Sequence, residues 1–184
     1  MLNAYLLLGL AATAAAIDIR FHYGDDQGKC EAAYTACVGS SARNCCVYGG
    51  TYASTASVVA VPSAWTITAN GYRGRGCEVQ QFQGIGRGKD VCLGHVGPSY
   101  SGAFYYFGGK KRDEDQKCEG EQRVNQLGLE DGTIYDIVGL SDNEIDEMVC
   151  FTLLIGISHQ TQCQLTVHSK HHSKHFHDDS TAEV

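Results

Sequence analysis

The chain has 184 residues and a formal net charge of −7; 43% of its residues are hydrophobic, 22 are glycine, nine are cysteine and two are proline. This apolar content is too high for a disordered protein, and the length suits one compact domain with tails. The chain is acidic, and its central arginines and lysines stand in glycine-rich turns without an RNA-binding aromatic motif, so nucleic-acid binding is not predicted.

The first predicted element is a secretory signal peptide over residues 1–16. An apolar stretch from Ala4 to Leu10 runs into small residues, and residues 14–16 (AAA) fit the A-x-A cleavage pattern. The alternative, a strand or helix of the mature fold, is disfavoured because the run is too short to span a bilayer and ends in a cleavage-like tripeptide. We therefore expect a secreted, extracellular protein that starts near Ile17 and has no membrane anchor.

Secretion makes disulfides the expected state of the cysteines. Because nine is an odd number, one thiol stays free, is buried, or pairs with a second copy in a disulfide-linked dimer. The adjacent Cys45 and Cys46 cannot easily bond to each other, so each is expected to reach a different partner. Six cysteines precede Arg112 and can close three bridges, which leaves one bridge and the odd thiol for the other three. The spacings do not decide the individual pairings. The nine positions are Cys30, Cys37, Cys45, Cys46, Cys77, Cys92, Cys118, Cys150 and Cys163.

Residues 28–39 (GKCEAAYTACVG) predict a short amphipathic helix. Cys30, Ala33, Tyr34 and Cys37 fall at positions i, i+3, i+4 and i+7, and Gly39 is a stop signal. We expect the two cysteines to attach this helix to a sheet.

Five short strands are predicted next, from segments rich in Val, Ile, Thr and aromatic residues that glycine-rich turns separate. Tyr105, Tyr106 and Phe107 are interpreted as core residues and cross-strand pairs rather than as a ligand platform. The predicted fold is mainly β, a disulfide-stapled antiparallel sandwich or small barrel with one or two short helices, in a single domain over residues 17–167. The five segments are residues 57–61, 64–69, 77–82, 90–96 and 103–107.

The charge-dense run over residues 109–122 predicts an exposed loop. Its dibasic pair, Lys111 and Arg112, gives the alternative of proteolytic processing after Arg112. The charge balance also changes here: residues 17–112 carry ten basic and six acidic side chains, net +4, and residues 113–184 carry four and fifteen, net −11. The halves are therefore electrostatically complementary, and an acidic C-terminal segment can lie against the basic sheet loops.

Residues 140–150 (LSDNEIDEMVC) predict a short helix, because Ser141 and Glu144 form a capping box ahead of apolar residues that share one face. A calcium loop is not supported, since the glycine turn and the distal glutamate of an EF-hand are missing. Residues 150–168 then predict two strands around a turn at residues 159–160, with Cys150 and Cys163 placed to tie them down.

The acidic C-terminal tail, residues 168–184, holds five of the eight histidines. If residues 168–177 form a helix, four imidazoles share one face with two aspartates just beyond it, which is a ligand set for zinc or copper. The alternative is a solvated tail with incidental metal affinity. The other histidines, His22, His95 and His159, are isolated and are interpreted as hydrogen-bonded surface or core residues. The candidate metal ligands are His168, His171, His172, His175 and His177.

Catalytic motifs are missing from the sequence: it has no H-E-x-x-H, no G-x-S-x-G and no P-loop, and its cysteines are better explained as bridges than as nucleophiles. We therefore expect a protein that is not an enzyme and requires no cofactor. The alternative is a secreted hydrolase, because the carboxylate pair of a glycosidase needs no local motif.

The layout of residues 1–110 resembles the small cysteine-rich secreted proteins of filamentous fungi, a group that includes host-directed effectors. The resemblance rests on the apolar leader, the segment with two cysteines, the adjacent Cys45 and Cys46 and the Gly/Tyr-rich β region. It implies a binding protein, a ligand or inhibitor, that acts on an extracellular protein of a host or a competitor and modulates host defence. From charge and hydropathy we expect no nucleic-acid or membrane partner. The runner-up is an extracellular zinc- or copper-binding protein that works through its tail.

Overall fold

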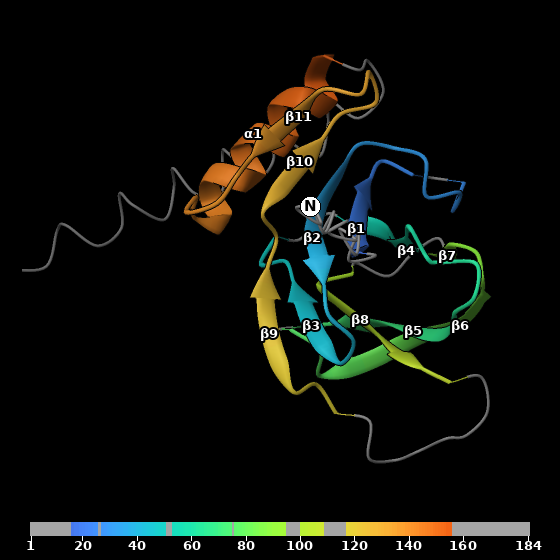
Figure 1. The fold of residues 1–184 in the computed structure, drawn as a ribbon. Coiled ribbons are helices and arrows are strands. Elements are labelled where there is room, and N and C mark those ends of the chain that lie inside the picture. Colours follow the sequence, from blue (N-terminus) through green and yellow to red (C-terminus); the bar gives the residue numbers. More distant parts are fainter. Residues whose placement is uncertain are drawn as a thin grey trace, which may run out of the picture.

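A computed structural model of the protein describes residues 16–25, 27–50, 53–74, 76–94, 100–108 and 117–155, the last four by backbone alone. Within these ranges the chain forms eleven strands and one helix (Figure 1). Six strands form the first sheet, in the order β11 (Ile134–Asp136), β10 (Gln126–Gly128), β2 (Tyr34–Ser40), β1 (Ile17–Tyr23), β4 (Ala53–Val59) and β7 (Val91–Leu93). Five form the second sheet, in the order β6 (Val79–Arg87), β5 (Thr66–Arg73), β8 (Gly102–Phe107), β3 (Asn44–Val47) and β9 (Gly120–Arg123).

Strand pairing is antiparallel throughout the described ladders except between β3 and β9, which run parallel. The single described helix, α1 (Asp142–Ile155), lies beside the β10–β11 end of the first sheet (Figure 1). The predicted fold class, a disulfide-stapled and mainly β protein with a short helix, is therefore confirmed. The one parallel pair makes the second sheet mixed.

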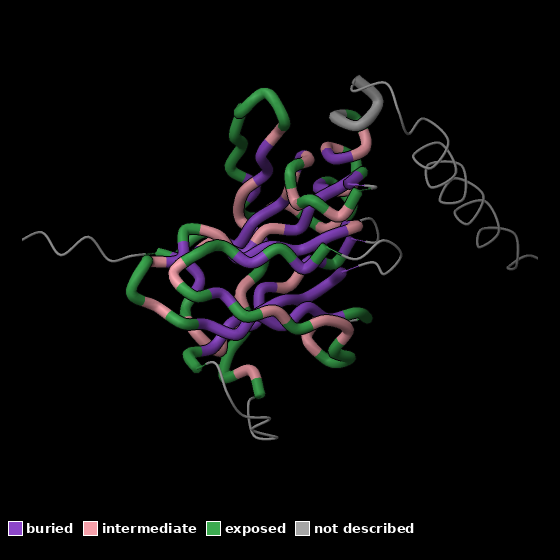
Figure 2. Tube along the Cα trace, turned by 90° about the vertical axis from the view of Figure 1, so that its right-hand side faces the viewer, coloured by how far each residue is buried: buried purple, intermediate pink, exposed green. Residues whose placement is uncertain are grey.

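The main core lies between the two sheets. In β1 the side chains of Ile17, Ile19, Phe21 and Tyr23 are at most 1% exposed, which is the period-two burial of a strand with one face on the core. They pack with inward residues of the second sheet, including Ile67, and Figure 2 shows these buried segments at the centre of the molecule. A smaller aromatic cluster, formed by Tyr72, Phe104 and Tyr106, lies on the other face of the second sheet.

Three disulfides tie the described elements together. Cys37 and Cys46 join β2 to β3 and so link the two sheets; Cys45 and Cys77 join β3 to the turn between β5 and β6; Cys30 and Cys92 join the segment before β2 to β7. Two predictions are confirmed: Cys45 and Cys46 have different partners, and the six cysteines before Arg112 close three bridges. Among the described cysteines Cys118 is free, and Cys150 is disulfide-bonded.

The helix predicted over residues 28–39 is wrong, because Tyr34–Ser40 form strand β2. This strand lies inside the first sheet, between β1 and β10, where both of its edges make backbone ladders. The helical spacing of apolar residues covers only twelve residues, and the hydrogen bonds to β1 and β10 outweigh this weak local preference. In addition, the β-branched and aromatic side chains of Tyr34, Thr35 and Val38 favour a strand.

The five predicted strands overlap β4, β5, β6, β7 and β8. Tyr105 and Tyr106 are core residues as predicted, being 4% and 7% exposed, whereas Phe107 is 54% exposed at the end of β8. Its ring contacts Trp65 edge-on, with the ring centroids 4.9 Å apart. Phe107 is therefore a surface residue and not a core residue, and it is the cross-strand partner of Ile67, as predicted.

Two predictions after residue 108 need correction. Part of the loop predicted over residues 109–122 is strand, because Gly120–Arg123 form β9, a polar edge strand that pairs with β3. The charged side chains of this exposed edge strand do not alternate with hydrophobic ones, so the sequence lacks the pattern that predicts a strand. Residues 150–155, predicted as strand, continue helix α1. The second predicted strand, the dibasic pair and the leader lie outside the described residues.

The described residues contain no helix long and apolar enough to cross a membrane. β1 begins at Ile17, directly after the predicted leader, so the expected cleavage would leave the buried strand whole.

Candidate functional site

The five histidines predicted to bind metal all lie outside the described residues. Three other features of the described residues are candidate functional sites: a buried polar cluster beside the Cys30–Cys92 bridge, a group of three sulfurs, and an acidic surface on β10, β11 and α1.

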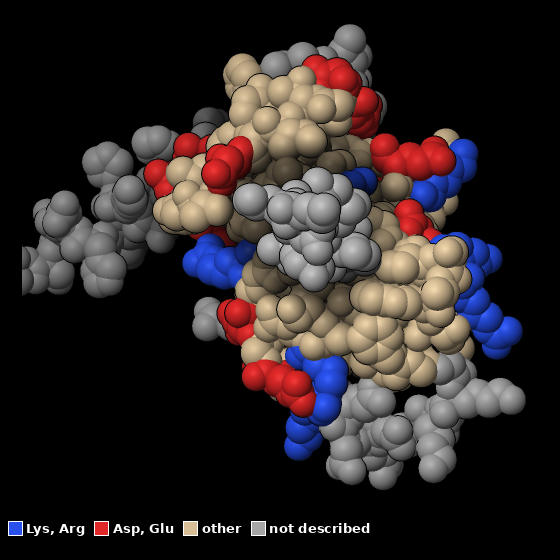
Figure 3. Space-filling view, in the orientation of Figure 1, with Lys and Arg blue, Asp and Glu red and all other residues tan. Residues whose placement is uncertain are grey.

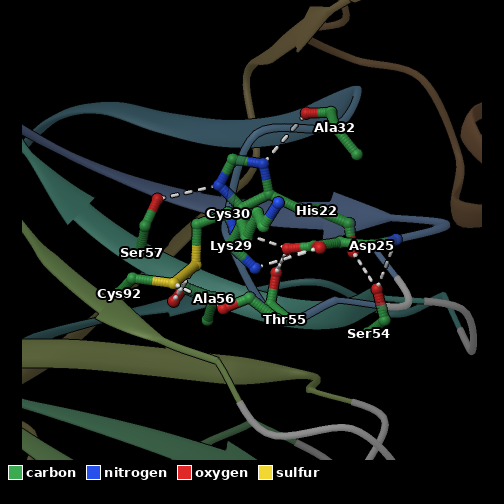
Figure 4. The surroundings of a disulfide bond; sticks show 11 residues. His22, Asp25, Lys29, Cys30, Ala32, Ser54, Thr55, Ala56, Ser57 and Cys92 are labelled. Carbon is green, nitrogen blue, oxygen red and sulfur yellow. Dashed lines mark hydrogen bonds between the residues drawn. A yellow bond between two sulfur atoms is a disulfide. The ribbon is translucent and has the colours of Figure 1, made fainter.

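The polar cluster is centred on Asp25, which is 7% exposed (Figure 4). Its carboxylate accepts hydrogen bonds from the backbone N–H of Lys29 at 3.0 Å, from the backbone N–H of Cys30, and from Thr55 Oγ1 at 3.0 Å. Burial raises the pKa of Asp25, but these hydrogen bonds, with His22 nearby, outweigh it and lower the pKa below its usual value. Cys30 has a φ of +58°, and the carboxylate holds it in this left-handed conformation, in position to reach Cys92.

His22 lies in the same cluster and contacts Ser57. Its Nδ1 donates to the carbonyl oxygen of Ala32 at 3.0 Å, which leaves Nε2 to accept from Ser57 Oγ at 2.8 Å (Figure 4). A histidine that accepts from a serine is the start of a nucleophilic dyad, but His22 is 2% exposed and Ser57 is 3% exposed. A substrate cannot reach the hydroxyl, so the cluster positions the Cys30–Cys92 bridge and does not form an active site.

The second feature is a group of three sulfur atoms. The sulfurs of Cys45, Cys77 and Cys118 all lie within 4.8 Å of one another. Two of them are bonded to each other, and a disulfide sulfur is not a thiolate ligand, so the group does not fit a metal ion in this state. The sequence predicted that one thiol is left over. It did not predict that Cys118 lies beside the Cys45–Cys77 bridge, because this proximity depends on the long-range parallel pairing of β3 with β9.

The third feature is the acidic unit, defined as residues 126–155 and comprising β10, β11 and α1. It contains seven acidic residues and no Lys, Arg or His. Figure 3 shows the acidic side chains on the part of the surface where Figure 1 places these elements. The seven residues are Glu130, Asp131, Asp136, Asp142, Asp146, Glu144 and Glu147.

The acidic unit is held firmly on the β-domain, which we define as residues 17–125 with strands β1 to β9. Ile145 and Val149 of α1 are 1% and 2% exposed and belong to the main core. Tyr48 Oη donates to Asp146 Oδ1 at 2.7 Å, and Arg123 of β9 pairs with Asp142. The helix therefore packs directly on the segment that follows β3 and presents its opposite face to solvent.

Large apolar side chains are exposed on the same unit. Of the eight that the described part of the chain exposes, four lie here, with exposed fractions of 43 to 70%. β11 is also an edge strand, which in the described structure pairs only with β10. Exposed apolar groups on a unit whose own charged side chains are all acidic, two of them on an edge strand, are typical of a protein-binding surface. The four residues are Ile134, Tyr135, Val138 and Phe151.

Comparison with known proteins covers the β-domain. The protein-family model ARB_05566_N, described as an N-terminal domain, matches residues 18–125, which is more than half of the chain. No curated protein and no solved structure matches the chain. The matched region ends just before β10, so the acidic unit follows it directly.

Proposed function

We propose that this chain, which belongs to the ARB_05566_N family, is a secreted, non-enzymatic binding protein of effector type whose acidic unit binds a basic surface on an extracellular or host protein. The observation that carries the proposal is the combination of seven carboxylates, no basic residue and four exposed large apolar side chains within residues 126–155.

The binding role follows from the physical character of the acidic unit. Exposed apolar side chains at the centre of an interface supply affinity, and a surface of one charge speeds the approach of a partner of the opposite charge. Because the unit lacks positive charge, the partner is expected to present Lys or Arg around an apolar or extended segment. Within the described residues the outer edge of β11 has no strand partner, so this edge can add such a segment as a further strand.

Secretion is supported by two independent features. Three disulfides among the described residues suit an oxidising compartment, and the sequence opens on an apolar leader that ends in small residues. A preformed, cross-linked fold also suits a protein that must survive outside the cell.

The test compares two double variants that remove exposed apolar groups from different faces. Ile134→Ser with Phe151→Ser alters the acidic unit, and Val79→Ser with Ile85→Ser is the matched control on β6, where the two side chains are 55% and 46% exposed. Mature protein is immobilised, extracellular host proteins are captured, and the affinity of each captured protein is then measured for both variants.

We expect a partner that binds the acidic-unit variant at least about tenfold more weakly than the wild type and binds the β6 variant with unchanged affinity. Removing apolar side chains from the centre of an interface lowers the binding free energy by more than about 1.4 kcal/mol, which corresponds to this tenfold loss. Raising the salt concentration should also weaken binding. A partner that binds both variants equally well would contradict the proposal. Hydrolysis of cell-wall polysaccharides by the purified protein would support the hydrolase alternative instead.

A further inference from the structure

Cys118 is a free, half-buried thiol whose sulfur lies within 4.8 Å of both sulfurs of the Cys45–Cys77 bridge. It packs with Cys77 against the aromatic cluster on the outer face of the second sheet. Its backbone is fixed beside β3, because the N–H of Glu119 donates to the carbonyl oxygen of Arg43 at 2.8 Å. A thiol held against a disulfide is the arrangement that thiol–disulfide exchange requires.

We propose that Cys118, Cys45 and Cys77 form an exchange site in which the bridge moves from Cys45–Cys77 to Cys45–Cys118. The sulfur of Cys118, as a thiolate, forms a bond to Cys45 Sγ while the Cys45–Cys77 bond breaks. The bonding electron pair leaves with Cys77 Sγ, which takes up the proton that Cys118 released. The step conserves one disulfide and one thiol, so no external oxidant or reductant is needed.

Burial decides which sulfur is released. Cys45 is 3% exposed in β3, whereas Cys77 is half-buried in the turn between β5 and β6. Releasing Cys45 would place a thiolate in the core, and releasing Cys77 places it at the surface turn, which is less costly. The exchange therefore detaches the β5–β6 turn from β3, attaches the start of β9 in its place, and delivers a thiol to the surface turn.

The groups around Cys118 indicate how pH acts on the exchange. Burial, with Glu121 of β9 nearby, raises the pKa of the Cys118 thiol above its usual value, while a local backbone hydrogen bond partly opposes this. Tyr72 and Tyr106 face the thiol from β5 and β8, and burial raises the pKa of Tyr72 to about 12, so its phenol stays neutral at pH 9. The exchange should be slow at neutral pH and should accelerate about tenfold per pH unit while the thiol remains mostly protonated.

The first test is the Cys77→Ser variant, with its disulfides assigned by tandem mass spectrometry because Cys45 and Cys46 are adjacent. The variant is refolded in a glutathione redox buffer, whose oxidised form accepts the two electrons, and the expected product has a Cys45–Cys118 bridge in place of two free thiols. Cys92→Ser is the matched control: within the described residues no third sulfur lies beside its bridge, so Cys30 should stay open to alkylation. A Cys77→Ser protein in which both Cys45 and Cys118 are alkylated would overturn the proposal.

The second test uses the wild-type protein and does not depend on a variant folding. After incubation at pH 7 or pH 9, free thiols are trapped with N-ethylmaleimide and mapped by mass spectrometry. Label should move from Cys118 to Cys77 with time, faster at pH 9, and the Cys118→Ser protein should show no label on Cys77. Label that stays on Cys118 alone after long incubation at pH 9 would overturn the proposal.

Discussion

His22 illustrates how burial and hydrogen bonding fix the protonation state of a single residue. The sequence predicted an isolated histidine with a hydrogen-bonded role, and the structure confirms this, with Ala32 and Ser57 as the partners. The partners themselves were not predictable, because Ser57 lies on β4 and reaches His22 only through the antiparallel register of β1 with β4. The role of Asp25 was not predicted for the same reason. Its hydrogen-bond donors come partly from the local turn at Lys29 and Cys30 and partly from Thr55 on the neighbouring strand β4.

At the residue scale we predict that acidification destabilises the fold through His22. Burial, with Arg20 nearby, lowers the pKa of His22, and the Ala32 hydrogen bond and Asp25 oppose this only in part. The unfolded chain takes up a proton near the ordinary pKa of 6.5, while the folded chain does so only at lower pH. The free energy of unfolding should therefore be highest above pH 6.5 and fall below it, by at most about 1.4 kcal/mol per pH unit from this group.

The measurement is urea denaturation from pH 7.5 to 4.5 for the wild type and for His22→Gln, which keeps a donor and an acceptor but does not titrate. The other histidines titrate in both proteins, so the difference isolates His22. Parallel pH profiles would show that His22 does not carry the effect.

At the element scale, the helix and strand predictions succeeded where one local signal dominated. The capping box at Ser141 and Glu144 forms as predicted: the N–H of Ser141 donates to Glu144 Oε2 at 2.7 Å, and the N–H of Glu144 donates to Ser141 Oγ at 3.4 Å. The prediction failed for β2, whose conformation is decided by its neighbours β1 and β10, and for β9, whose pairing with β3 spans more than seventy residues. Long-range ladders leave little trace in a local sequence pattern.

We predict that Ser141→Ala lowers the free energy of unfolding by about 1 kcal/mol, the usual cost of losing a serine N-cap. The loss should be visible in global unfolding because Ile145 and Val149 join α1 to the main core. Chemical denaturation of the variant measures it, with Ser63→Ala, an exposed serine in the turn before β5, as the control. An equal effect of both substitutions would mean that the cap contributes nothing specific.

At the scale of the whole molecule, the sequence indicated how the chain divides but not how its parts meet. The change from net +4 to net −11 after residue 112 anticipated an acidic C-terminal part, and the structure shows its helix α1 packed on the first half of the chain through Tyr48. Arg123, which lies in the acidic part itself, pairs with Asp142. The cysteine count before Arg112 predicted the number of bridges. Their pairing depended on how the two sheets stack, which no spacing encodes.

The histidine-rich tail, residues 168–184, lies outside the described residues, and metal binding there stays a prediction from the sequence. We predict that changing His168, His171, His172 and His175 to Ala abolishes zinc or copper binding, measured by isothermal titration calorimetry, and that a chain ending at Thr166 behaves in the same way. The melting temperature should not change, because the described core is built from residues 17–149.

The pH dependence of metal binding tests whether protonating ligands hold the metal, and the variants then separate imidazole ligands from sulfur ligands. Imidazoles with a pKa of about 6.5 are roughly nine-tenths protonated at pH 5.5, so zinc binding by the wild type should weaken markedly between pH 7.5 and 5.5. If the four-histidine variant still binds zinc and the Cys118→Ser protein does not, Cys118 is a ligand and the tail prediction is wrong.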